Sequence, residues 1–112
     1  MISVTDKRLI GLMIEKIDRL TFVVSNHSRD DIKEDFTLSD TIEYEFEKLY
    51  EDIVRLSPLV LLDNPQLPID DLRSIRNRVA HDYESVVIDI LIDTIIDDFP
   101  HFKEQLQEAL NK

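Results

Sequence analysis

The stretch VVIDILIDTIIDDF, residues 86–99, decides the fold class of this chain. Its β-branched residues would suit a buried strand as well as a helix. Asp89, Asp93 and Asp97 are spaced by four, which gives a helix one solvated stripe, although a strand would also place them on one face. No other part of the sequence offers a partner strand. We therefore predict a helix here, and Ser85 can cap it.

The segments before this helix carry apolar residues at spacings of three and four. They predict one helix from about Asp6 to Ser25 and a second that Thr37 or Ser39 caps. The stripes are Ile10, Met13, Ile17, Leu20 and Val24 in the first helix, and Ile42, Phe46, Leu49, Ile53 and Leu56 in the second. The polar run NHSRDDIKEDFTLSD, residues 26–40, is expected to interrupt the helical pattern.

Prolines mark the remaining boundaries. Pro58 lacks an amide proton and stops or kinks the second helix. Residues 57–68, SPLVLLDNPQLP, are interpreted as a connector with at most one helical turn. Pro68 can then take the first position of a third helix that runs to about residue 81 or 83. Pro100 opens a last short helix, which places Phe102, Leu106 and Leu110 on one side.

The composition fits a single helical domain over residues 1–112. The chain is 43% hydrophobic and 33% charged, with one glycine, which is too apolar for disorder and too poor in turn residues for a sandwich of short strands. We predict an all-α, up-and-down bundle of four to five helices. The helix at 86–99 is apolar nearly all round, so it is either a homodimer interface or the central core helix.

Charge and cysteine content narrow the function classes. A net charge of −11 opposes general attraction to nucleic acid, so any contact with a polyanion has to be local. The absence of cysteine excludes disulfides and thiolate metal sites and fits a reducing, cytoplasmic setting. The N-terminal MISVTDKRLIGLMIEKIDRL carries charges every few residues, so we expect neither a signal peptide nor a membrane span.

The densest basic cluster is RSIRNRVAHDY, residues 73–83. On a helix, Leu72, Ile75 and Val79 face the core, and two adjacent outward ridges carry Arg73, Asn77 and His81, and Arg76, Ala80 and Tyr83. An arginine offers a planar fork that matches a phosphate, and a histidine can move a proton near neutral pH. This set suits phosphodiester chemistry. Arginine and histidine five apart are also common as plain solvated surface residues.

The motif resembles the Arg-x4-His-x-Tyr signature of HepT-like ribonuclease toxins, which belong to the HEPN superfamily of small helical proteins. LSPLVLLDNPQLPIDDLRSIRNRVAHDY, residues 56–83, is similar to the family's kinked connector, Pro-led helix and signature. IDDFPHFKEQLQEAL, residues 96–110, is similar to its closing segment. The resemblance covers the whole chain, although its first sixty residues are generic helix.

The resemblance implies a bundle that dimerises so that two Arg–His motifs face each other across a cleft. The implied activity is endoribonuclease cleavage through the substrate's own 2′-hydroxyl, which needs no metal or other cofactor and acts on RNA, not DNA. Arg76 would bind the phosphate, His81 would act as general acid or base, and Asn77 would orient the site. Tyr83 matches the tyrosine that a nucleotidyltransferase (MNT-type) antitoxin modifies with AMP, although tyrosine near a helix end is also a common packing residue. Asp82 departs from the small residue usual there, and its charge disfavours a nearby phosphate.

Two further interpretations remain open. The chain could be a non-catalytic HEPN-type binding module that docks a nucleotidyltransferase and presents its substrate, or a plain dimerisation module; its acidic charge favours either. His27, with Asp30 and Asp31, is a weak metal candidate in what we expect to be a solvated loop. His101 is expected to be a first-turn surface residue, and the acidic stripes are expected to be solvated faces.

Overall fold

Over residues 2–112, the part of the chain that the computed structural model describes, the backbone forms seven helices and no strand. Five of them have at least twelve residues: α1 (Val4–Ser25), α3 (Phe36–Val54), α5 (Ile69–His81), α6 (Glu84–Asp97) and α7 (Phe99–Leu110). The two short ones are α2 (Arg29–Glu34) and α4 (Pro58–Asp63). The predicted all-α class and the helix at 86–99 are confirmed. None of these helices is long and apolar enough to cross a membrane.

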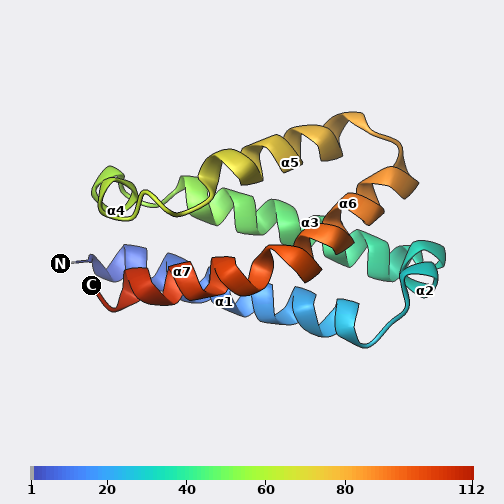
Figure 1. Ribbon diagram of the computed structural model, residues 1–112, viewed down its shortest axis with the longest axis horizontal. Coiled ribbons are helices and arrows are strands. Elements are labelled where there is room, and N and C mark those ends of the chain that lie inside the picture. The colour runs from blue at the N-terminus through green and yellow to red at the C-terminus, as the bar shows by residue number, and fades with distance from the viewer. Residues whose placement is uncertain (1) are drawn as a thin grey trace.

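The long helices run up and down along a molecule of 45 × 27 × 20 Å, with both termini at one end (Figure 1). α1, α3 and α5 alternate in direction, and α6 and α7 together make the fourth pass. The fourth pass is broken at Asp98, the C-cap of α6, just before Pro100 in the first turn of α7. The predicted bundle is therefore confirmed as four passes built from five long helices.

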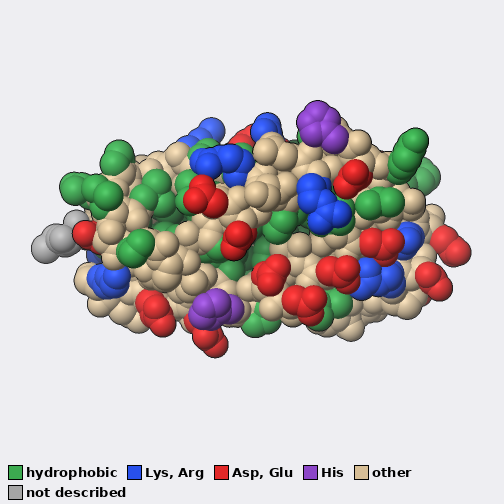
Figure 2. Space-filling model, turned by 45° about the horizontal axis from the view of Figure 1, so that its top comes forward, with side chains coloured by type: hydrophobic (Ala, Val, Ile, Leu, Met, Phe, Trp, Pro, Cys, Tyr) green, Lys and Arg blue, Asp and Glu red, His purple; other side chains and the backbone are tan. Residues whose placement is uncertain are grey.

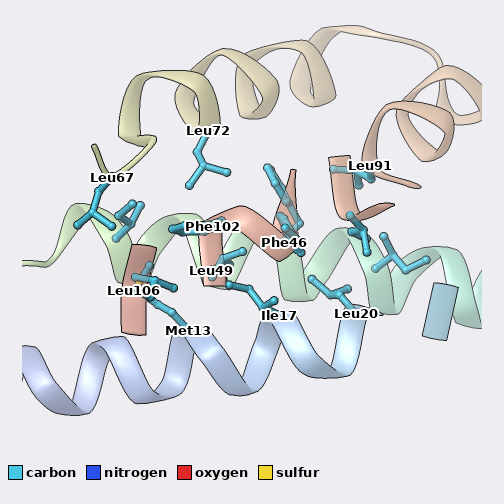
Figure 3. Close-up of a cluster of buried hydrophobic side chains, with 14 of the residues drawn as sticks. Met13, Ile17, Leu20, Phe46, Leu49, Leu67, Leu72, Leu91, Phe102 and Leu106 are labelled. Carbon is cyan, nitrogen blue, oxygen red and sulfur yellow. The ribbon is translucent and has the colours of Figure 1, made fainter. Parts of the chain in front are cut away.

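The core lies between α1, α3 and the α6–α7 pass, and α5 covers it from the side of α3 and α6. Figure 3 shows Met13 and Ile17 of α1 pointing toward Phe46 and Leu49 of α3, while Leu72 descends from α5. The predicted stripe of the second helix is completely buried, from Ile42 to Leu56. Burial of these side chains is the main stabilising contribution to the fold.

Several predicted boundaries were wrong. Side chains accept hydrogen bonds from the free amides at the starts of α2 and α3, and the apolar spacing of the sequence does not show which side chains do so. The polar run 26–40 contains α2, which buries Ile32 and is capped by the Ser28 hydroxyl. Asp35, not Thr37 or Ser39, caps α3. The Ser39 hydroxyl donates instead to the Ile32 carbonyl at 2.7 Å.

The later boundaries also differ from the prediction by one or two residues. Pro68 precedes α5 as its N-cap rather than taking its first position, whereas the end of α5 at His81 is as predicted. Tyr83, not Ser85, is the N-cap of α6, because the backbone is already extended at Asp82 and Tyr83. α4 has six residues, more than the single turn expected, since Pro58 is compatible with a helix start and Val60 is buried.

Polar side chains tie the passes together at several points. The Asp6 carboxylate accepts hydrogen bonds from the backbone amide and the hydroxyl of Ser57, at 3.0 and 2.8 Å. The hydrogen bond from the amide is the main reason that the pKa of Asp6 is lowered. Lys16 of α1 pairs with the buried Asp52 of α3 at 2.7 Å. Lys103 of α7 pairs with Asp18 of α1 at 2.7 Å.

The sequence led us to expect that the aspartate stripe of α6 is a solvated face. In the structure, two of its aspartates form ion pairs instead. Arg29 of α2 bonds Asp89 at 2.9 Å and Asp93 at 2.6 Å, and Lys33 bonds Asp89 at 2.7 Å. Asp93 and Asp89 raise the pKa of Arg29, and the two cations lower that of Asp89. This network fastens α2 onto α6.

Candidate functional site: the end of helix α5

The Arg–His stretch forms the second half of α5, where the helix stands at the surface. Arg76, Asn77 and His81 are all exposed, as predicted for the two outward ridges. The opposite face of α5 holds the helix in place, because Leu72 is buried and Ile75 and Val79 pack against the core. A guanidinium, a carboxamide and an imidazole therefore share the last two turns of one exposed helix.

Tyr83 lies just beyond that helix. It is 86% exposed and belongs to the extended link between His81, the last residue of α5, and Glu84, the first of α6. The alternative that Tyr83 is a packing residue is therefore wrong. Its phenol is accessible beside the end of α5, although it does not continue the ridge of Arg76.

Arg76 turns toward α3 rather than toward His81. Its Nε lies 3.7 Å from Oε1 of Glu47, and its guanidinium carbon lies 5.5 Å from the centre of the Tyr50 ring. The Arg76 side chain remains 44% exposed, so its outer edge is open to a ligand. A separation of five residues on an ideal helix places Arg76 and His81 about 140° apart around the helix axis. Within one copy of the chain, the two side chains are therefore poorly placed to contact the same phosphate.

Sequence reasoning missed Glu47 and Tyr50. They flank the buried stripe of α3 at a spacing of three, which puts both on one helical face. No sequence pattern indicates that this face meets Arg76 of a helix more than twenty residues later.

Asp82 is directed to a neighbour on its own segment. Its carboxylate lies 3.8 Å from Nε of Arg78, on the helix turn before it. A groove of about 810 Å³ between α5 and the α6–α7 junction includes Arg78 but not Arg76, Asn77, His81 or Tyr83. The exposed motif residues therefore lie on an open surface. Figure 2 shows basic side chains on the upper part of this face, where α5 runs, and acidic side chains mainly across its lower part.

Three carboxylates lie close together near the first turn of α6. One oxygen from each of Asp40, Glu43 and Glu84 lies within 4.8 Å of the others. Burial, followed by the neighbouring Glu84 carboxyl, raises the pKa of Glu43 to about 7. The Glu43 carboxyl is therefore partly protonated near neutral pH, so the three carboxyls do not present a full set of anionic ligands.

The other histidines take no part in this surface. His27 is exposed, and its Nδ1 lies 2.9 Å from the Val23 carbonyl at the end of α1. His101 is exposed in the first turns of α7, as predicted, with Nδ1 at 3.7 Å from Glu104. Neither joins a group of three close metal-ligating side chains among residues 2–112.

The fold and the site together define a class of protein: a small all-α bundle in which one helix ends with exposed arginine, asparagine and histidine side chains and is followed by an exposed tyrosine. The family model described as HepT-like, ribonuclease HepT-like, matches residues 13–109. The chain therefore belongs to the HepT-like ribonuclease family, as its motif resemblance predicted. Searches of curated proteins and of solved structures gave no match.

Proposed function

We propose that this protein is the toxin of a toxin–antitoxin pair and acts as a metal-independent endoribonuclease. The observation that carries the proposal is the exposure of Arg76, Asn77 and His81 at the end of α5, in a chain of the HepT-like ribonuclease family. A phosphate can reach the open edge of Arg76, and RNA supplies its own nucleophile. DNA lacks that nucleophile and is not expected to be cleaved.

In the proposed reaction, an imidazole of His81 takes the proton of the 2′-hydroxyl as this oxygen attacks phosphorus. The bond between phosphorus and the 5′-oxygen breaks, and the 5′-oxygen receives a proton from a protonated His81. The products are a 2′,3′-cyclic phosphate and a free 5′-hydroxyl. Arg76 stabilises the charge that develops on the non-bridging oxygens, and Asn77 orients the phosphate.

We propose that two copies assemble this site. A twofold axis through the ends of α5 would bring the Arg76 of one copy near the His81 of the other, which overcomes their angular separation on one helix. Sedimentation should show a dimer at micromolar concentration. Ile92 and Ile95 of α6 are unsuitable interface probes, because both are only 2% exposed within one protomer. Val86, exposed in the first turn of α6, is a suitable probe: Val86→Asp should shift the dimer toward monomer without unfolding the protomer.

Tyr83 is the proposed site of neutralisation. A nucleotidyltransferase antitoxin would transfer AMP to its exposed phenol, which adds bulk and a negative phosphate beside the imidazole of His81. Tyr83→Phe removes only the acceptor oxygen, so it should cleave RNA but resist the antitoxin's enzymatic activity. Mass spectrometry after co-expression should find AMP on the wild-type tyrosine. Suppressed toxicity with an unmodified tyrosine would mean neutralisation by binding alone.

The test of catalysis compares Arg76→Ala and His81→Ala with Arg55→Ala, an exposed arginine at the C-cap of α3. The two site variants should lose RNA cleavage at unchanged helix content, and Arg55→Ala should retain it. Cleavage by the His81 variant at the wild-type rate would refute the mechanism.

A non-catalytic binding module is the second candidate, because the net charge is −11 and Glu47 already occupies one side of Arg76. In that case Arg76 and His81 would hold a nucleotide phosphate for a docked nucleotidyltransferase. Purified wild-type dimer that binds AMP or ATP but leaves varied RNAs intact would favour this function.

A further inference from the structure

The ring of Tyr50 in α3 lies against the motif arginine Arg76 of α5. The Arg76 guanidinium carbon lies 5.5 Å from the centre of the Tyr50 ring. The Tyr50 hydroxyl lies beside Arg73 and is the main reason that the pKa of this arginine is raised. Tyr50 is itself partly buried and packed against the core, so it is a fixed platform between α3 and the end of α5.

A fixed platform matters because arginine has a long, flexible side chain. Ordering such a chain upon binding opposes association, and a side chain already held in its bound orientation avoids most of that loss. A guanidinium over an aromatic face is held by the ring's negative quadrupole and still presents its edge to a phosphate. The partly exposed Arg76 has this arrangement.

We propose that Tyr50 is a positioning residue for RNA binding, whose ring holds the Arg76 guanidinium in the orientation that receives a phosphate. This inference rests on the proposed function. α3 also supplies a matched control, because Tyr44 carries Lys48 at 5.3 Å in the same kind of cation–π contact. Neither Tyr44 nor Lys48 belongs to α5 or its motif.

Binding can be measured separately from cleavage with a fluorescent RNA oligonucleotide whose 2′-hydroxyls are methylated. By fluorescence anisotropy at low salt, Tyr50→Leu should weaken binding about two- to ten-fold, the range expected for losing one preordered side chain. Tyr50→Phe keeps the ring and should bind as the wild type does, and so should Tyr44→Leu. In the Arg76→Ala background, Tyr50→Leu should cause no further loss.

The outcomes separate this inference from the proposed function. An equal loss from Tyr50→Leu with and without Arg76, or a Tyr50→Phe variant as weak as Tyr50→Leu, would overturn the positioning role alone. Wild-type protein that fails to bind the oligonucleotide would overturn RNA as the ligand and the proposed function with it.

The contact itself can be tested in the wild-type protein, in case Tyr50→Leu does not fold. The Arg76 Nε–Hε signal in NMR spectra, identified by its loss in Arg76→Lys, should be shifted by the ring current of Tyr50 and should show a nuclear Overhauser contact to that ring. Tyr50→Phe should preserve both. An unshifted signal without the contact would overturn the inference irrespective of any RNA measurement.

Discussion

Replacing Glu43 with glutamine should abolish a loss of stability that the wild type shows between pH 5 and pH 8. Burial and the Glu84 carboxyl raise the pKa of Glu43 from its ordinary 4.5 to about 7. Between these values the folded protein binds more protons than the unfolded chain, so the free energy of unfolding falls as pH rises. Glutamine has the shape of the protonated acid and carries no charge at either pH.

The magnitude follows from that difference of about 2.5 pH units, which sets a ceiling of about 3.4 kcal/mol. Glu43 is only partly buried, and solvent screening reduces the effect to about 1 kcal/mol. Relative to the wild type, Glu43→Gln should therefore be more stable by about 1 kcal/mol at pH 8 and nearly equal at pH 5.

Urea unfolding followed by circular dichroism at both pH values and one protein concentration measures this difference. Glu51→Gln is the control, since Glu51 lies on the same helix and pairs with Lys48. Its effect should be the same at both pH values. If Glu43→Gln also changes stability equally at pH 5 and pH 8, the pKa of Glu43 is not raised in the folded protein.

Three other variants test separate parts of the structure. Ile92→Asp should destabilise the protomer by about 4 kcal/mol or more, measured by urea unfolding, because it buries an unpaired charge in the core; a folded but monomeric variant would contradict the burial. Asp89→Asn should lower the free energy of urea unfolding, and by less at high salt, because Arg29 loses one of its carboxylates. An equal loss at all salt concentrations would exclude an ionic cause. Glu47→Gln should strengthen RNA binding about two- to five-fold in anisotropy measurements, since a carboxylate no longer competes for Arg76; weaker binding would mean that Glu47 orients Arg76.

The helices α1 and α3 were predictable because their apolar spacing alone specifies a buried face. The stripe from Ile42 to Leu56 is buried throughout, and the aspartates of α6 point away from the core as a helix requires. The short α2 was not predictable in the same way. It has a single buried residue, Ile32, and its ion pairs are with a helix more than fifty residues away in sequence.

The position of the α6 helix within the core also required the structure. Its apolar run allowed either a dimer interface or a central helix, and the fold buries Ile92 and Ile95 against its own neighbours. At the candidate site, the exposure of Arg76 and His81 followed from helical geometry. The turn of Arg76 onto Tyr50 did not, because it depends on how α5 lies across α3.

The most direct test of metal-independent RNA cleavage is an analysis of the ends that the purified wild-type protein leaves on RNA in excess EDTA. Attack by the 2′-hydroxyl predicts cleavage unaffected by EDTA, with 2′,3′-cyclic phosphate on one fragment and a free 5′-hydroxyl on the other, by mass spectrometry. Loss of cleavage in EDTA, or fragments that carry 5′-phosphates, would contradict the roles proposed for Arg76 and His81.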